Sequence, residues 1–227
     1  MRNNKWCIYT SSYDRGLEHL LKMWPDVKKA VPKAELHVFY GWQLFEGFYK
    51  NNPASMSWKS DMDKMMEHDG ITHHGRISQP EIEKWYKKCG LWTYPTHFGE
   101  ISCISAMKAQ AWGAIPVVVN YAALETTVKH GVKVNGDIYD EEVQERYKAC
   151  LVNLLKDHKE QEKMREPMMK WAKKKFSWKK VAQQWSDDFG SDELKEAMDI
   201  IIKEYPPAAK LMPVQLQQKY GLKETYE

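Results

Sequence analysis

The stretch 94–120 constrains the fold of this chain more than any other part of the sequence. Short apolar runs at 91–94 and 116–119 flank its centre, and the first stops at Pro95, so both runs read as buried strands. Between them, apolar residues recur at helical spacing up to Gly113, a typical helix stop. Strand, helix and strand in this order predict a right-handed parallel crossover.

The loop that joins the first of these strands to its helix, residues 96–103, is a candidate binding site. Ligands of open parallel sheets bind beyond the carboxyl ends of the strands, and the free amides of a helix N-terminus attract anions such as phosphate. The loop brings Glu100 to this place. Glu100 either belongs to a site or complements the helix dipole, and its spacing does not decide between the two.

A second strand-to-helix turn lies near the start of the chain. An apolar run at 6–10 precedes it, an amphipathic pattern follows it, and Asp14 is a candidate helix cap. The turn carries two hydroxyls, a guanidinium and a small residue: Ser11, Ser12, Arg15 and Gly16. These groups suit a diphosphate, and they equally suit ordinary helix capping.

The remaining pattern extends the same alternation of strands and helices. Strands are expected at 35–40, 71–74 and 132–134, and a capping box opens a helix at 78–81. An aromatic stripe at 42–49 is interpreted as core. Five or six such units predict an α/β fold with a single Rossmann-like, doubly wound parallel sheet. Extra C-terminal helices follow, which gives expected domains at 1–189 and 190–227.

Composition narrows the classes of function. The net charge of +3 demands neither a nucleic acid nor an acidic partner, and no apolar run approaches the roughly 20 residues that span a bilayer. The start of the chain lacks a signal-peptide pattern, so a cytoplasmic protein, at most peripheral to a membrane, is expected. The four cysteines form no Cys-x-x-Cys pair and the histidines have no ligand spacing, so no metal or other cofactor is expected.

The segment 156–180 is strongly basic and contains Trp171, Phe176 and Trp178. Such a patch suits a nucleic acid or an anionic membrane surface. Lysines on the solvated side of an amphipathic helix give the same pattern and are the favoured interpretation, which makes a nucleic-acid partner unlikely.

The segment FGEISCISAMKAQAWGAIPVV resembles the signature of the retaining GT-B glycosyltransferases, family 4 in particular. In that signature Glu, seven residues and a second Glu precede Ala, Gly and Pro-Val-Val. Glu100 matches the first Glu, and Lys108 stands at the second, which in the family commonly holds the ribose hydroxyls. A lysine cannot accept those hydrogen bonds, although it can approach the diphosphate as a point charge.

The resemblance spans residues 5–189 and implies further site residues. SSYDRGLEHLL resembles the first motif of the same C-terminal half, in which the residue matching Arg15 contacts the pyrophosphate. Family residues matching Arg76 and Ile77 contact the base through the main chain, and Glu125 is left as either a ligand of sugar or ribose or a cap of its own helix. Glu100 and the amides near Ile101, Ser102 and Cys103 are expected to hold the hexose and diphosphate.

The resemblance implies the C-terminal, nucleotide-sugar-binding half of a GT-B enzyme. Its expected function is hexose transfer from a UDP- or GDP-sugar, without a metal, with retention, and with Arg15 and Glu100 as catalytic residues. The acceptor domain would come from a partner chain, from a second copy in a homodimer, or from sequence of the same protein that has been removed from this chain. The alternative is a catalytically degenerate module that binds a nucleotide or a protein, and Lys108 favours it.

Overall fold

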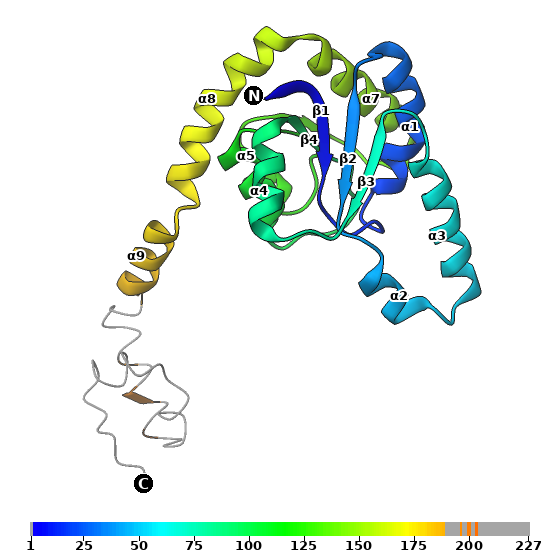
Figure 1. Ribbon diagram of the computed structural model, residues 1–227. Helices are drawn as coiled ribbons and strands as arrows, with labels where there is room; N and C mark the ends of the chain where they lie inside the picture. Colours follow the sequence, from blue (N-terminus) through cyan, green and yellow to red (C-terminus); the bar gives the residue numbers. More distant parts are fainter. Residues whose placement is uncertain (1, 189–195, 197–198, 201–202, 204–227) are drawn as a thin grey trace. The chain divides into compact units, whose positions relative to one another are not determined.

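The computed structural model describes residues 2–188, 196, 199–200 and 203 (Figure 1). Contacts divide the chain into two units, Met1–Lys175 and Phe176–Glu227, and each is described by itself. The expected helices of the tail beyond residue 189, and the expected domain boundary there, fall almost wholly outside the described residues and stay predictions.

A six-stranded parallel sheet with the strand order β3-β2-β1-β4-β5-β6 organises the first unit. Its strands are β1 (Asn3–Tyr9), β2 (Glu35–Phe39), β3 (Ile71–Gly75), β4 (Cys89–Tyr94), β5 (Ile115–Val119) and β6 (Val132–Val134). The central strands β4 and β5 are buried along their whole length, as their continuous apolar runs predict. The expected doubly wound, Rossmann-like α/β fold is therefore confirmed.

Helices cover both faces of this sheet. The helices of this unit are α1 (Leu17–Ala30), α2 (Gln43–Tyr49), α3 (Pro53–Met66), α4 (Gln79–Lys88), α5 (Ile104–Trp112), α6 (Leu124–Thr127), α7 (Glu141–Lys156) and α8 (His158–Lys175). Figure 1 shows α4 and α5 on one face and α1 with α3 on the other. No helix in the described part of the chain is long and apolar enough to cross a membrane.

A tyrosine of α7 joins the two central strands. Tyr94 N of β4 donates to the Tyr147 hydroxyl at 3.1 Å, and that hydroxyl donates to Val117 O of β5 at 2.6 Å. Tyr147 is completely buried, so water does not compete for these groups. One side chain thus fixes both the docking of α7 and the pairing of β4 with β5.

Several local expectations need correction. The N-cap of α1 is Gly16, not Asp14. Of the aromatic stripe expected in the core, Trp42 is buried and Phe45 is partly buried against the core, but Phe48 is 80% exposed. The apolar residues that mark α5 in the sequence form its core face only in part: Trp112 packs against the core, but Ile104 is 63% exposed. The buried residues of α5 are Ala106, Ala109 and Gln110.

The second unit contributes one described helix, α9 (Trp178–Asp188). None of its residues is buried, and the Trp178 side chain is 84% exposed. The interpretation of the basic segment as a solvated helix face fits the exposure of Lys179 and Lys180.

Candidate functional site

The strand order places a topological switch point between β1 and β4. From β1 the chain continues to β2 on one side, and from β4 it continues to β5 on the other. The turn after β1 and the loop after β4 therefore diverge and leave a crevice at the carboxyl ends of the two strands, which is where open α/β sheets bind ligands.

The turn and the loop touch at Gly16. This residue has φ +103°, and a Cβ there would lie 2.1 Å from Pro95 O. Only glycine adopts that conformation without strain and leaves room for the carbonyl. The contact sets the first amides of α1 against the end of β4 and places the neighbouring Arg15 over the loop.

The structure brings the two predicted catalytic residues together across the crevice. Arg15 Nη1 lies 3.5 Å from Glu100 Oε1, and Arg15 Cζ lies 3.8 Å from the centre of the Phe98 ring. The Arg15 side chain is 34% exposed and that of Glu100 is 11% exposed, so both reach solvent. Stacking and pairing fix the direction of the guanidinium.

Tyr94 holds the Glu100 carboxylate from the other side. Its hydroxyl donates to Glu100 Oε1 at 2.7 Å and accepts from Ser11 Oγ at 3.2 Å. Burial raises the pKa of Tyr94, so the residue stays a phenol and remains a donor. Neither Tyr94 nor Phe98 was predicted as a site residue, because one reads as strand core and the other as an ordinary loop aromatic.

The loop after Glu100 leads into the N-terminus of α5. Ile101 is 97% exposed and Ser102 is exposed, whereas Cys103, the N-cap residue, is buried. Burial raises the pKa of the Cys103 thiol to about 12, so it stays protonated and is a poor nucleophile. The loop therefore offers backbone amides to an anion and no reactive thiol.

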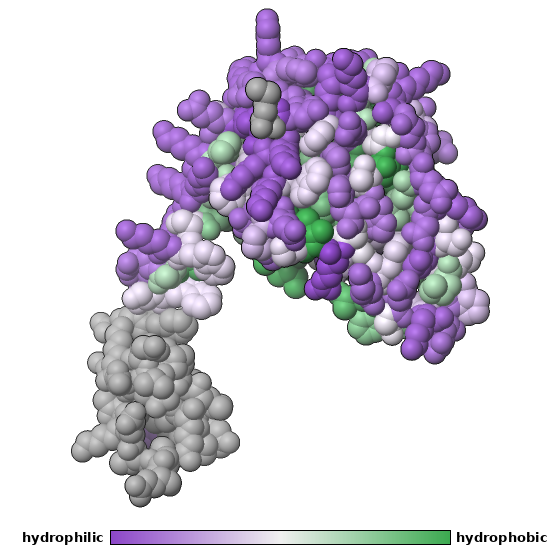
Figure 2. Space-filling model, viewed as in Figure 1, coloured by the Kyte–Doolittle hydropathy of each residue, from purple (hydrophilic) through white to green (hydrophobic). Residues whose placement is uncertain are grey.

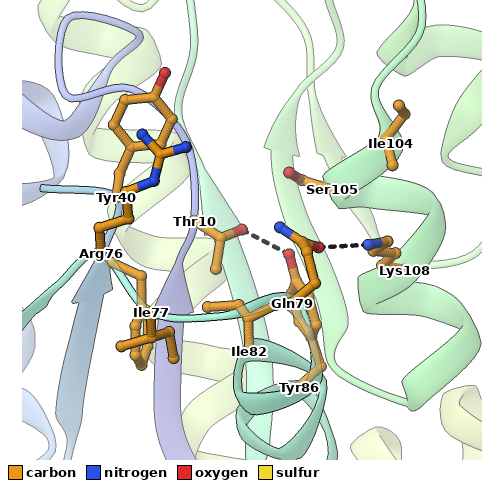
Figure 3. Close-up of a pocket in the computed structure, with 11 residues that line it drawn as sticks. Thr10, Tyr40, Arg76, Ile77, Gln79, Ile82, Tyr86, Ile104, Ser105 and Lys108 are labelled. Atoms are coloured by element: carbon orange, nitrogen blue, oxygen red, sulfur yellow. Dashed lines mark hydrogen bonds between the residues drawn. The ribbon is translucent and has the colours of Figure 1, made fainter. Parts of the chain in front are cut away.

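A second group of predicted residues lines a pocket of about 200 Å³ at the same edge of the sheet (Figure 3). We call it the Arg76 pocket. Arg76 and Ile77 come from the segment after β3, and Lys108 comes from α5. Lys108 Nζ donates to Gln79 Oε1 at 2.6 Å, and none of the lining residues is acidic.

The other lining residues of the Arg76 pocket are Thr10, Phe39, Tyr40, Gln79, Ile82, Tyr86, Ile104 and Ser105. They combine hydroxyls with apolar side chains, which suits a base and a ribose. Figure 2 shows apolar surface along the lower rim of this unit, in the region where the strands end in Figure 1.

Two of the predicted site residues, Ser12 and Glu125, place no side chain in the contacts described above. Ser12 contributes its carbonyl, which accepts from the Tyr9 hydroxyl and from Arg15 N and so shapes the turn. Glu125 is exposed in the first turn of α6 and is not among the residues that line the Arg76 pocket. Among the described residues, no group of three or more His, Cys, Asp or Glu is placed to hold a metal ion.

The family model of glycosyl transferases group 1 matches residues 7–171. The chain belongs to this family. A comparison with curated proteins gives no match. For this group 1 glycosyltransferase domain, the expected resemblance to the C-terminal half of a GT-B enzyme is thus confirmed.

Solved structures similar to this glycosyltransferase domain show the same fold. The pneumococcal O-GlcNAc transferase in complex with UDP and GlcNAc has TM-score 0.65 and 14% identity, and the match covers 82% of this chain and 35% of that one. Sucrose-phosphate synthase of Thermosynechococcus elongatus has TM-score 0.66 and 16% identity, with 85% and 46% covered. HepE of Anabaena in complex with UDP-glucose has TM-score 0.63 and 13% identity, with 82% and 49% covered. The chain spans between about a third and a half of these proteins.

Proposed function

We propose that this chain is the donor-binding half of a glycosyltransferase that takes a hexose from a nucleoside diphosphate sugar. The observation that carries the proposal is the Arg15–Glu100 pair, which spans the switch point between β1 and β4 at 3.5 Å. Helices α1 and α5 both begin at this crevice, so a cation, a carboxylate and two sets of free amides converge there.

Each part of a sugar donor has a suitable partner at this edge. The diphosphate suits Arg15, the Ser12 hydroxyl and the amides of Gly16 and Ile101–Cys103. The Ser11 hydroxyl joins them if it turns its proton from Tyr94 to the diphosphate. The hexose suits Glu100, because a carboxylate with two oxygens keeps acceptor capacity after bonding Tyr94.

The base and ribose suit the Arg76 pocket. Ile77 offers an apolar wall, and Lys108 can donate to ribose oxygens or to the diphosphate. UDP and UDP-glucose in similar structures favour a uridine donor, with GDP-sugars as the second choice. Glu125 remains a candidate contact to the sugar or ribose.

The proposed transfer needs stabilisation of a leaving diphosphate. The bond from the hexose C1 to the diphosphate oxygen breaks, and its electron pair stays with the diphosphate. The acceptor oxygen bonds to C1 on the same face from which the diphosphate departs, which gives retention, and its proton passes to the departing phosphate oxygen. Arg15 and the N-terminus of α5 supply positive charge where the negative charge develops, so a metal ion is not required on this proposal.

The domain that binds the acceptor is proposed to lie outside the sequence of this chain. This chain spans less than half of each of the similar structures named above. The acceptor domain is proposed to be a partner chain, a second copy of this chain, or a further segment of the same protein. A cytoplasmic setting, where nucleotide sugars are available, is part of the same proposal.

Calorimetric and thermal-shift titrations with UDP, GDP, ADP and their sugars test donor binding. A ligand that binds only the native state must stabilise it. Arg15→Ala should weaken binding of the preferred diphosphate by roughly 1.5–3 kcal/mol, the range for a hydrogen bond to a charged group. Lys22→Ala is the matched control, because it removes a positive charge from α1 at a side chain that is 58% exposed and paired with Glu18. An unchanged affinity of Arg15→Ala for the diphosphate would show that Arg15 does not bind it.

A second candidate function is a catalytically degenerate nucleotide- or protein-binding module. The observation that favours it is Lys108, which stands where the family signature has an acceptor carboxylate and instead binds Gln79. Slow hydrolysis of the donor sugar separates the two functions, because a pure binding module releases no hexose. Release that disappears in Glu100→Gln would support the enzyme, and a complete lack of release with tight nucleotide binding would support the module.

A further inference from the structure

A second cavity opens at the carboxyl edge of the sheet and belongs to no site described above. Its volume is about 480 Å³, and it lies beyond the ends of β4, β5 and β6. It is lined by Thr96, His97, Asn120, Tyr121, Asp137 and Tyr139, with Val119, Gly136 and Ile138 behind them. We call it the His97 pocket. It shares no lining residue with the Arg76 pocket.

Two buried polar atoms in this pocket have no hydrogen-bond partner among the described residues, namely His97 Nδ1 and Asn120 Oδ1. Leaving such a group unsatisfied costs stability, so native proteins usually supply a partner for it. Asn120 is itself held in place, since its Nδ2 donates to Asn135 Oδ1 at 2.8 Å. The acceptor oxygen of Asn120 is therefore fixed in direction and still lacks a donor.

The pocket also presents two exposed aromatic rings, Tyr121 at 48% and Tyr139 at 60% exposure. The Tyr139 ring does not move freely, because it contacts His19 edge-on at 4.9 Å and 82° and lies 4.9 Å from His97. A rigid, exposed ring gives large contact area at a small entropy cost. An aromatic face beside fixed hydrogen-bonding groups suits a ligand with one apolar face and a rim of hydroxyls.

The charges of the side chains that line the His97 pocket disfavour anionic ligands. Asp137 is the one acidic residue of the pocket and no lysine or arginine lines it, which disfavours phosphates and nucleotides. Asp137 Oδ1 accepts from Tyr139 N at 3.0 Å, and its carboxylate is otherwise suited to accept from hydroxyls. A neutral polyol is the ligand chemistry that fits rings, amide, imidazole and carboxylate together.

We propose that the His97 pocket binds a saccharide. The pocket lies next to the Arg15–Glu100 crevice, because His97 precedes Glu100 by three residues in one loop and Ala123 N, just after Tyr121, donates to Glu100 O at 3.1 Å. A role for this saccharide as the acceptor of transfer rests on the proposed function, whereas its binding does not.

Saturation-transfer NMR of the full chain tests the proposal. The probes are the methyl glycosides and disaccharides of glucose, galactose, mannose, N-acetylglucosamine and rhamnose at millimolar concentration. We expect at least one probe to receive saturation through its ring C–H protons. Tyr139→Ala should weaken that binding at least tenfold, and Tyr49→Ala, which truncates a 45% exposed tyrosine on α2, should leave it unchanged.

Asp137→Asn provides a second variant that preserves the shape of the pocket, in case Tyr139→Ala lowers the melting temperature sharply. A tenfold loss in either folded variant supports the site. Transfer to none of the probes, or binding that survives both substitutions, overturns the proposal.

The nucleotide titrations separate this proposal from the proposed function. Saccharide binding without any response to nucleotides would support the His97 pocket and contradict the proposed donor site. Nucleotide binding without a saccharide response does the reverse.

Discussion

Replacing Tyr94 by phenylalanine removes one hydroxyl and leaves the buried ring in place. That hydroxyl donates to the Glu100 carboxylate at 2.7 Å and accepts from Ser11 at 3.2 Å. A hydrogen bond to a charged group contributes roughly 1.5–3 kcal/mol to stability. Glu100 keeps Arg15 at 3.5 Å, and its side chain is 11% exposed and can recruit water. We therefore expect the lower part of that range, about 1.5–2 kcal/mol.

Urea unfolding followed by tryptophan fluorescence measures this loss as a lower midpoint with an unchanged m-value. The melting temperature should fall by roughly 3–8 °C, since one kcal/mol corresponds to about 2–4 °C in a domain of this size. Tyr49→Phe is the control for loss of an exposed phenol. In a double-mutant cycle with Glu100→Gln, the two substitutions should be coupled by at least about 0.5 kcal/mol. A loss no larger than that of Tyr49→Phe, or strict additivity with Glu100→Gln, would refute the view that Tyr94 holds Glu100.

Two further predictions concern residues that do not contact the Glu100 carboxylate, namely Gly16 and His37. Gly16→Ala should cost at least about 1–3 kcal/mol of unfolding free energy from backbone strain alone, because φ is +103° and the new Cβ would lie 2.1 Å from Pro95 O. Gly47→Ala in α2, where a Cβ meets nothing, should be neutral or stabilising in the same urea series, and equal effects would contradict the strain. Burial, with a smaller effect of His74, lowers the pKa of His37 from 6.5 to about 4, so the unfolded chain binds more protons between these values. Stability should thus fall as the pH drops from 6.5 to 4, and the slope should shrink in His37→Phe; an unchanged slope would exclude His37 as its source.

Much of the fold could be predicted from the sequence because its signals are local. Apolar runs bounded by glycine or proline mark β4 and β5, and the expected capping box of Ser78 and Glu81 is present with both hydrogen bonds. Gly113 ends α5 in the left-handed conformation, as expected of a helix stop. Burial of side chains was predicted less well. Phe48 has the spacing of a core residue, yet it is 80% exposed, whereas Phe45 of the same helix packs against the core.

Site residues that belong to a strand-to-helix turn or to a sequence motif were predicted. Site residues that meet only because separate elements pack together were missed. Arg15 and Glu100 follow the ends of two strands, and parallel topology brings such ends together. Tyr94 gave no signal, since its bond to Glu100 depends on how the loop folds back over six residues. The His19, His97 and Tyr139 cluster joins three elements far apart in the chain, and no local pattern announces it.

The Tyr147 hydroxyl also bears on the order in which the chain assembles. The hydroxyl bridges Tyr94 N and Val117 O, so the hydrogen bonding between β4 and β5 is complete only after α7 has docked. Tyr147 and Tyr94 are 53 residues apart in the sequence. Such distant closure is slow compared with helix formation. During synthesis, a nascent chain that ends before α7 would expose an unpaired amide and carbonyl in the middle of the sheet. Until α7 docks, these two backbone groups depend on water for a hydrogen bond, so the docking of α7 completes the hydrogen bonding of the two central strands.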